Sequence, residues 1–294
     1  MKKYSNKRMQ RFQIMRGYSR SKFHNLLKLI QQNFSEEFIE KELEISPKEF
    51  SELRYKLSPS IYDLMKITYH GKFDVCAYFE DLINDEWILK HLKKEPLIDK
   101  QFLVGAFTKN RVPLNIINYL DLHMGSSFTD TVLSRTAANR YFFEDQDKLI
   151  STRYMSRLHK ELSNFSGQGA EFLTTIGKNI AFYDNDQIFQ KSFNGRTFRQ
   201  AYEYLLDEVM PVLEHNFNYK ILSLSSNELK IEHSLKEELQ DLYGVKNYTG
   251  EETDSYKAGF GLTPGLITTK NFGESKIIKS LGQSGDTGIL SFKF

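Results

Sequence analysis

The stretch ESKIIKSLGQSGDTGILSFKF, residues 274–294, predicts two neighbouring strands of a sheet. Apolar and polar side chains alternate over Lys276–Leu281 and again over Ile289–Phe294, which is the period of a strand with one buried face. Gln283-Ser284-Gly285-Asp286, between the two runs, is typical of a turn. The stretch is therefore expected to form an antiparallel hairpin.

A second hairpin and two long helices are predicted upstream. Tyr219–Leu224 and Glu228–His233 alternate in the same way on either side of a short polar turn. Apolar residues at helical spacing indicate one helix over Thr152–Phe165 and another over Thr197–His215, with Val212 on the apolar stripe of the second. Helices packed on one side of an antiparallel sheet make an α+β domain, which is the fold expected for residues 96–294.

This region resembles a known family of sensor domains. SYKAGFGLTPGLITTKNFGESKIIKSLGQSGDTGILSFKF, residues 255–294, is similar to the end of the 4-vinyl-reductase-like domains, which are related to the haem-nitric-oxide-binding domains. The residues that match its Gly-x-Pro segment and Gly-Asp turn are Gly261, Pro264, Gly265, Gly285 and Asp286. FFEDQDKLISTRYMSRLHKELSNFSGQGAEFLTTIGKNIAF also looks like the family's helical half, so the resemblance spans roughly Phe102–Phe294. It implies a pocket between helices and sheet for an apolar or aromatic small molecule.

Two departures from the family bear on cofactors. The family commonly has cysteines on both sides of the final turn, where this chain has Ser280 and Gly288, so thiol-dependent metal or redox sensing is not expected. The related haem domains carry a Tyr-x-Ser-x-Arg signature, whereas YMSR at Tyr154–Arg157 has a different spacing. No haem, metal or other cofactor is therefore expected.

The segment from Phe182 to Met210 is crowded with aromatic side chains and contains two arginines. Aromatic walls with a few polar anchors are the usual form of a ligand site, and an arginine there could pair with a ligand carboxylate. For any single aromatic residue, packing in the core is the stronger explanation. The candidate ligand-binding residues are Phe182, Phe189, Phe193, Arg196, Phe198, Arg199 and Tyr202.

Residues 21–95 predict a succession of short helices. Ser35 and Ser46-Pro47 are suited to begin the second and third, because Ser caps a helix start well and Pro is favoured at the first helical position. The inner face of the fourth is expected to hold Ile61, Leu64, Met65 and Ile67. Lys93-Lys94-Glu95-Pro96 breaks the pattern and marks a domain boundary near residue 95.

The helices over Ser35–Leu82 are similar in pattern to the helix-turn-helix of the Cro and phage-repressor family. Glu40 and Glu44 depart from the family, which has a small residue and a glycine there, and a buried Glu40 would be costly. The candidate recognition helix also carries Glu49 and Glu52, although a helix that faces phosphates should not be acidic. DNA binding and a helical bundle used for dimerisation or partner binding both remain open.

Residues 1–20 form a basic arm, since residues 1–30 contain nine lysines and arginines and no acid. Such an arm attracts phosphates, although a solvated tail in front of the first helix is the favoured alternative. If DNA is bound, the candidate contacts are Arg8, Arg11, Arg16, Arg20, Lys22, Lys48, Ser51, Arg54 and Lys56. A homodimer is expected with DNA, because repressor-type modules read paired half-sites.

Composition and motifs exclude several classes of protein. The chain has 294 residues and one cysteine, which predicts two domains and leaves no internal disulfide or cysteine-rich zinc site. No apolar run is long enough to span a membrane, so a cytoplasmic protein is expected. Gly259, Gly261 and Gly265 lie among turn signals and do not form a dinucleotide-binding loop. An enzyme is not expected, unless a closed polar pocket places His123 or His159 beside a carboxylate.

The sequence thus predicts an all-α helix-turn-helix-like module joined to an α+β sensor domain. The expected function is a ligand-responsive transcriptional regulator that binds double-stranded DNA and an apolar or aromatic small molecule. The alternative is a signalling sensor whose helical module binds a protein partner or mediates dimerisation.

Overall fold

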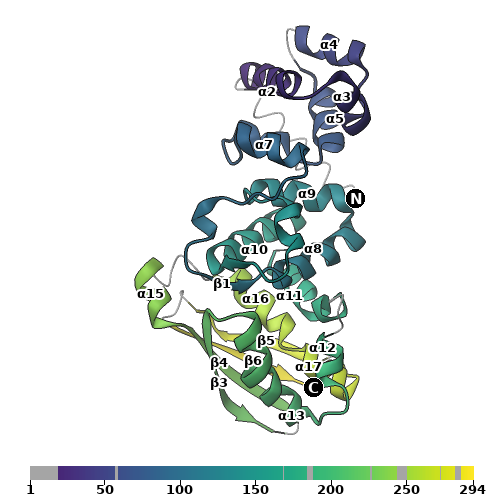
Figure 1. Cartoon of the computed structure of the whole chain (residues 1–294). Helices are drawn as coiled ribbons and strands as arrows, with labels where there is room; N and C mark the ends of the chain where they lie inside the picture. The colour runs from purple at the N-terminus through teal and green to yellow at the C-terminus, as the bar shows by residue number, and fades with distance from the viewer. Residues whose placement is uncertain are drawn as a thin grey trace. The chain divides into compact units, whose positions relative to one another are not determined.

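The computed structural model describes residues 19–56, 59–167, 169–183, 188–225, 227–243, 250–271, 273–281 and 286–294. The chain divides into two compact units. The helical unit comprises the described residues up to Asp99 together with Leu120–Phe142. The α+β unit comprises Lys100–Tyr119 and Phe143–Phe294 (Figure 1).

The helical unit contains the predicted succession of short helices. They are α2 (Ser19–Asn33), α3 (Glu36–Leu43), α4 (Pro47–Tyr55), α5 (Ile61–Gly71), α6 (Val75–Phe79), α7 (Asp85–Leu92), the end of α8 (Arg111–Met124) and α9 (Ser126–Arg135). The side chains of Ser35 and Ser46 cap α3 and α4 as the sequence predicts, and Ser60 forms a capping box with Asp63 at α5.

Two side chains lie elsewhere than predicted. Met65 is 46% exposed, because α5 buries Leu64 and Ile67 and turns residue 65 toward solvent. Glu40 is exposed rather than buried, so it carries no desolvation cost. Glu44 ends α3 in the left-handed region, with φ 52.

Residues 120–142 belong to the helical unit, although the sequence prediction placed them in the C-terminal domain. Arg135 is buried and forms ion pairs with Asp74 and Glu80, at 3.3 and 2.8 Å. The backbone N–H of Asp74 donates to the Ser134 hydroxyl at 2.9 Å. These contacts join residues about sixty positions apart in the chain, a range over which local patterns carry no signal.

The α+β unit is built from short helices and six strands among its described residues. Its regular helices are the beginning of α8, then α10 (Thr152–Ser166), α11 (Ala170–Asn179), α12 (Ile188–Phe193), α13 (Phe198–Tyr204), α14 (Met210–Leu213), α15 (Glu237–Tyr243), α16 (Glu251–Phe260) and α17 (Thr263–Thr269). Its strands are β1 (Ala106–Lys109), β2 (Leu149–Ser151), β3 (Phe217–Leu224), β4 (Glu228–Leu235), β5 (Glu274–Lys279) and β6 (Thr287–Lys293).

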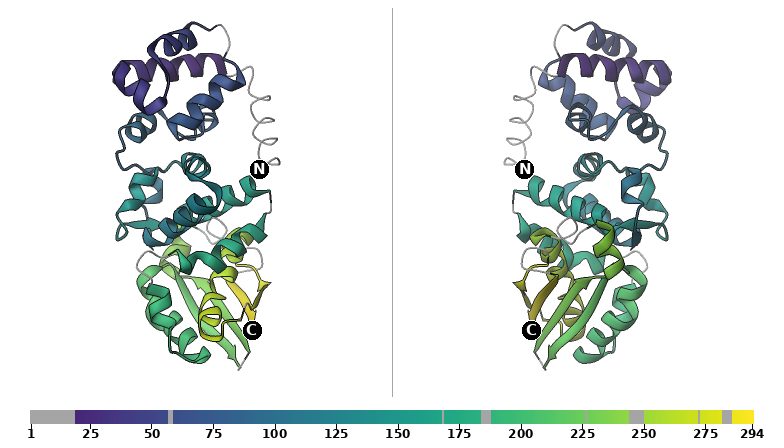
Figure 2. Two further views of the ribbon diagram at one scale, coloured as in Figure 1. Left: turned by 90° about the vertical axis from the view of Figure 1, so that its right-hand side faces the viewer. Right: turned by 90° about the vertical axis from the view of Figure 1, so that its left-hand side faces the viewer.

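The main sheet has the strand order β3-β4-β6-β5 and is antiparallel throughout. Ile231 of β4 stands opposite Leu290 of β6, and both are buried. On β4 the alternate residues Leu229, Ile231, His233 and Leu235 are buried, so one face of the sheet packs on helices (Figure 2). The α+β class and both predicted hairpins are confirmed.

The glycine-rich segment is helical, which corrects the prediction of turns there. It forms α16 and α17, and α16 packs along α11 (Figure 1). The glycines permit this contact: a Cβ at Gly177 of α11 would overlap the Tyr256 carbonyl oxygen, and one at Gly259 of α16 would overlap the Thr174 carbonyl oxygen. Glycine therefore serves here for close backbone approach, which local turn statistics do not distinguish from a turn.

Within the described residues, no helix is both long and apolar enough to cross a membrane.

Candidate ligand cavity

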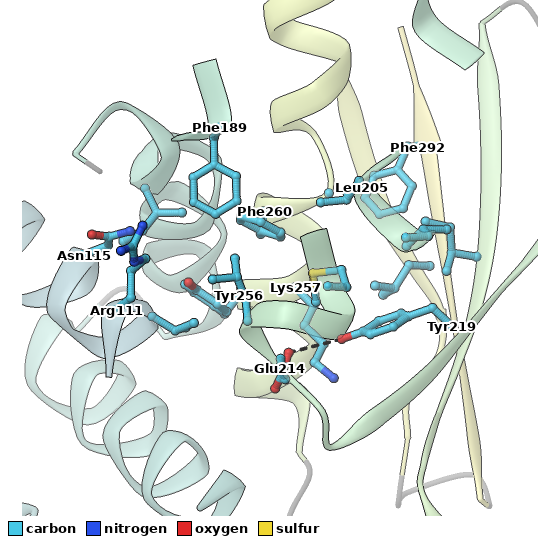
Figure 3. A pocket seen from close by; sticks show the side chains of 18 residues that line it. Arg111, Asn115, Phe189, Leu205, Glu214, Tyr219, Tyr256, Lys257, Phe260 and Phe292 are labelled. Atoms are coloured by element: carbon cyan, nitrogen blue, oxygen red, sulfur yellow. Dashed lines mark hydrogen bonds between the residues drawn. The ribbon is translucent and has the colours of Figure 1, made fainter. Parts of the chain in front are cut away.

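A cavity of about 70 Å³ lies between the helices and the sheet of the α+β unit (Figure 3). Helices α8, α12, α14 and α16 contribute to its walls, together with strands β3, β4 and β6. The lining residues are Arg111, Val112, Asn115, Ile180, Phe189, Leu205, Leu206, Met210, Leu213, Glu214, Tyr219, Ile231, Tyr256, Lys257, Phe260, Gly261, Leu290 and Phe292.

The size of the cavity limits its occupant to a few heavy atoms. An engineered apolar cavity of about 150 Å³ holds benzene or xenon and otherwise stays dry. The present cavity has about half that volume, and aliphatic and aromatic side chains make up most of its walls. Such a space suits a small apolar molecule better than water, which needs two to four polar partners.

A π-helical turn forms part of the wall. The predicted helix Thr197–His215 is α13, a π-turn over Leu205–Val209, and α14. Pro211 explains the interruption, because it has no N–H to donate and its ring would collide with the carbonyl of residue 207 in an α-helix. The N–H of Met210 bonds instead to the Leu205 carbonyl, five residues back. This wider turn presents Leu205 and Leu206 to the cavity and leaves Val212 53% exposed, contrary to the prediction.

The polar edge of the cavity is formed by Glu214, Tyr219 and Lys257 (Figure 3). The Tyr219 hydroxyl donates to Glu214 Oε2 at 3.2 Å. Burial raises the pKa of the Tyr219 phenol well above its usual value, so this hydroxyl stays protonated. Lys257 Nζ has no hydrogen-bond partner among the described residues and lies 2.9 Å from the centroid of the Phe217 ring.

Burial also governs the charge of Lys257. The loss of hydration lowers the pKa of its amine to about 8, and the nearby carboxylates of Glu214 and Asp254 offset this only in part. The amine is therefore much easier to deprotonate than that of an exposed lysine.

Asp254, one turn before Lys257 on α16, anchors that helix to the sheet. His233 of β4 lies 3.0 Å from Asp254 Oδ1, and Asp254 Oδ2 accepts from the Ser280 hydroxyl at 2.6 Å and the Leu281 N–H at 3.0 Å. Burial lowers the pKa of His233, so we place a neutral imidazole here that donates from Nε2. The network fixes the part of α16 that carries Tyr256 and Lys257.

The residues predicted to bind the ligand are mostly elsewhere. Of the seven, Phe189 alone lines the cavity. Phe193 and Tyr202 are fully buried in the core, where the Tyr202 hydroxyl donates to the Gly261 carbonyl at 2.7 Å, and Phe198 packs against Tyr202. Phe182 is 45% exposed, and Arg196 and Arg199 lie on the surface. Their aromatic stripe is thus mainly core packing, which the sequence had given as the stronger explanation.

Sequence patterns indicate little about the residues that line the polar edge. Lys257 lies in a segment that was expected to form turns, and Glu214 and Tyr219 lie at a helix end and in a strand. One signal was present: Lys257 is the single charged side chain between Ser255 and Thr269. A charged residue in an otherwise uncharged stretch is a candidate for a functional position, because charged side chains are seldom fully buried without a partner.

The candidate DNA-contact residues fall into three groups. Arg8, Arg11 and Arg16 lie outside the described residues. Lys22 and Lys56 form ion pairs with Asp81 and Asp63, at 2.6 and 2.7 Å. The others, on or near the surface of α2 and α4, are Arg20, Lys48, Ser51 and Arg54.

No protein-family model and no curated protein matches the chain. Solved structures superpose on the chain with low TM-scores. An Fe(II) unliganded mutant H-NOX protein from K. algicida is 10% identical, with 63% of this chain and 96% of that one covered and a TM-score of 0.46. An oxygen-binding H-NOX domain related to soluble guanylate cyclases is 13% identical, with 64% and 95% covered and a TM-score of 0.43. Overlap at this level carries no conclusion about ligand or activity, and the helix-turn-helix resemblance finds no support in it.

The cavity does not fit haem, the group named in another of these overlapping structures. Histidine and cysteine, two of the usual axial ligands, are absent from its described lining residues, and Met210, which does line it, would need a histidine partner because methionine ligates haem together with histidine. Tyr219 and Tyr256 line it, but burial raises the pKa of both phenols, which disfavours the phenolate that binds iron. A volume of about 70 Å³ is also far below the several hundred Å³ of an ordinary cofactor pocket.

Proposed function

We propose that the α+β unit is a sensor domain that binds a small, neutral and largely apolar molecule. The cavity between helices and sheet carries this proposal, because its apolar walls enclose a space that water fills poorly. The ligand gains the hydrophobic free energy of leaving water, while a charged ligand of the same size would lose its hydration.

Helix α16 is suited to carry the effect of binding away from the cavity. Tyr256, Lys257 and Phe260 line the cavity from α16. The same helix is in backbone contact with α11 through Gly177 and Gly259. A ligand that binds one position of α16 better than another shifts the population of that position, which is the thermodynamic basis of sensing.

A binding role agrees with the histidine chemistry of the described residues. His159 is fully buried, its Nδ1 lies 3.2 Å from the Thr253 hydroxyl, and its ring stacks on Tyr256. Burial lowers its pKa to about 3, so the imidazole is neutral at pH 7. It lies beside a hydroxyl rather than a carboxylate, and it is not among the cavity-lining residues. His159 therefore does not meet the condition under which the sequence would indicate an enzyme, a histidine beside a carboxylate in a closed polar pocket.

Xenon binding tests the cavity directly, because xenon occupies small apolar cavities. We expect xenon pressure to shift the methyl NMR signals of Leu205, Met210 and Leu290 until a single site is saturated. Ile231→Phe should abolish the shifts, because Ile231 is a buried lining residue and the larger ring fills the space. Ile278→Phe is the matched control, since Ile278 is 51% exposed on β5 and does not line the cavity. Absent or unsaturable shifts in the wild type would contradict the proposal.

For the helical unit we propose a protein-binding role rather than DNA binding. Two of its candidate phosphate contacts, Lys22 and Lys56, are held by carboxylates of the same unit. Three large side chains are exposed along one face of α5: Tyr62 at 82%, Met65 at 46% and Tyr69 at 64%. Tyrosine and methionine are enriched at protein interfaces, while a surface for DNA needs free cations.

DNA binding by the full chain separates these two roles. We expect weak binding to duplex DNA in fluorescence anisotropy at about 50 mM salt, and no effect of Lys48→Ala combined with Arg54→Ala. Lys276→Ala, on the exposed surface of β5, is the control for a general loss of positive charge. Strong binding that weakens steeply by about 200 mM salt and is lost in the double variant would establish the DNA-binding role instead.

A further inference from the structure

We propose that Lys257 captures a carbonyl ligand: its side-chain amine forms an imine with a small apolar aldehyde bound in the cavity. The proposal rests on the proposed function, because it takes the cavity as the ligand site. It extends that function by naming the chemical class of the ligand and by attaching the ligand covalently to the protein.

The surroundings of the Lys257 amine are unusual for a lysine. The residue is 9% exposed, and Nζ has neither a hydrogen-bond partner nor an ion pair among the described residues. Its neighbours are aromatic rings, with Nζ 2.9 Å from the Phe217 centroid and 5.5 Å from the Tyr219 centroid. Buried lysines are normally paired, since an unpaired ammonium loses its hydration without compensation. The Lys257 amine therefore has no hydrogen bond or ion pair with the described residues to break before it reacts.

The same surroundings supply the reactive form of the amine. Imine formation needs the neutral amine, and a lysine removed from water is activated in this way. With its pKa lowered to about 8, roughly a tenth of the amine is neutral at pH 7, against fewer than about one in a thousand for an exposed lysine. Lys257 lines the cavity, while its Nζ lies against the ring of Phe217, which is not a lining residue. Rotation about the bonds of its flexible four-carbon stem would bring the amine to a bound carbonyl.

The reaction balances without any further reagent. The nitrogen lone pair attacks the carbonyl carbon, and the electrons of the C=O π bond pass to oxygen, which takes up a proton to give a carbinolamine. The nitrogen loses one proton at this stage. The oxygen then takes up a second proton, the C–O bond breaks as the nitrogen lone pair forms the C=N bond, water leaves, and loss of the remaining N–H proton gives the imine. The Tyr219 hydroxyl and the Glu214 carboxylate border the same edge and are the groups suited to donate and accept these protons (Figure 3).

Charge favours an aldehyde over a carboxylate ligand. The carboxylates of Glu214 and Asp254 both act on the Lys257 amine. A ligand carboxylate at this edge would meet the Glu214 carboxylate in a poorly hydrated site, while Arg111, the other charged lining residue, contributes from α8 and not from this edge (Figure 3). A neutral carbonyl group avoids that repulsion, and the cavity volume of about 70 Å³ limits the molecule to a few carbon atoms.

Reductive trapping of the full chain with n-butanal and cyanoborohydride at pH 7 tests the proposal. We expect peptide mapping to find one butyl group per chain, on Lys257, before exposed lysines are modified. Lys257→Met should lose this early adduct, while Lys276→Met, an exposed lysine on β5, should keep it. n-Butanol should slow the labelling, because it fits the same cavity and has no carbonyl group.

The outcomes distinguish this proposal from the proposed function. Modification of exposed lysines without modification of Lys257 would overturn the proposal of an imine. Saturable xenon binding in the same protein would still support the cavity as the ligand site of the sensor. Labelling of Lys257 that n-butanol does not slow also overturns it, because the amine would then react without the cavity. Circular dichroism checks that the Lys257→Met chain is folded. Loss of labelling in a folded variant is then due to loss of the amine.

Discussion

Gly259→Ala is expected to lower the free energy of unfolding of the α+β unit by about 3 kcal/mol, the upper end of the usual cost of overpacking. The new methyl group would overlap the Thr174 carbonyl oxygen and come within 2.8 Å of its carbon and 2.9 Å of the Lys178 nitrogen. All three are backbone atoms of α11, so the overlap is relieved only by moving one helix away from the other. Helix propensity acts in the opposite direction, since alanine is favoured over glycine by about 1 kcal/mol.

Urea denaturation measures this effect, and Thr175→Ala on α11 is its matched control. Thr175 is exposed, so an alanine there tests the helix without touching the contact with α16, and a change within about 0.5 kcal/mol is expected. Equal stability of Gly259→Ala and the wild type would mean that α11 and α16 are not in backbone contact.

Lys257→Met is expected to raise the free energy of unfolding at pH 7 by about 3 to 4 kcal/mol, because burial lowers the pKa of the lysine from 10.5 to about 8 and each tenfold change in acidity corresponds to about 1.4 kcal/mol. Methionine fills the space of the lysine stem without a charge. At pH 7 both the folded and the unfolded wild type carry the proton, so the wild type bears the whole cost of the buried ammonium. The variant bears none of it.

The pH dependence of this difference has a definite sign. The folded pKa of about 8 lies below that of the unfolded chain, so between these values the unfolded state binds more protons. The wild type therefore gains stability from Lys257 as the pH rises above 8, and the gap to Lys257→Met narrows. Urea unfolding at pH 7 and at about 9.5 measures it, and other titrating groups cancel in the difference. Lys276→Met should show no such change, and an equal gap at both pH values would contradict a buried unpaired amine.

The elements with clear short-range signals were set by the sequence alone. Ser46-Pro47 begins α4 because a serine cap and a proline at the first helical position act within one turn. The alternation over Glu228–His233 predicts β4 because successive side chains of a strand lie on opposite faces of the sheet. These signals lie within a few residues of the element they specify, so the α+β class and both hairpins could be predicted from them.

The tertiary structure alone decided where the candidate ligand cavity lies and which helices form its walls. Gly259 forms part of a helix because Gly177, more than eighty positions earlier, offers it a backbone surface. Arg135 joins the helical unit through Asp74, and Lys257 borders a cavity because β3 brings Tyr219 to α16. Each of these depends on residues far apart in the chain, whose contacts leave no local period. Short-range patterns therefore determined the capped short helices and the two hairpins, while long-range packing determined the place of α16, the cavity and the surroundings of the Lys257 amine.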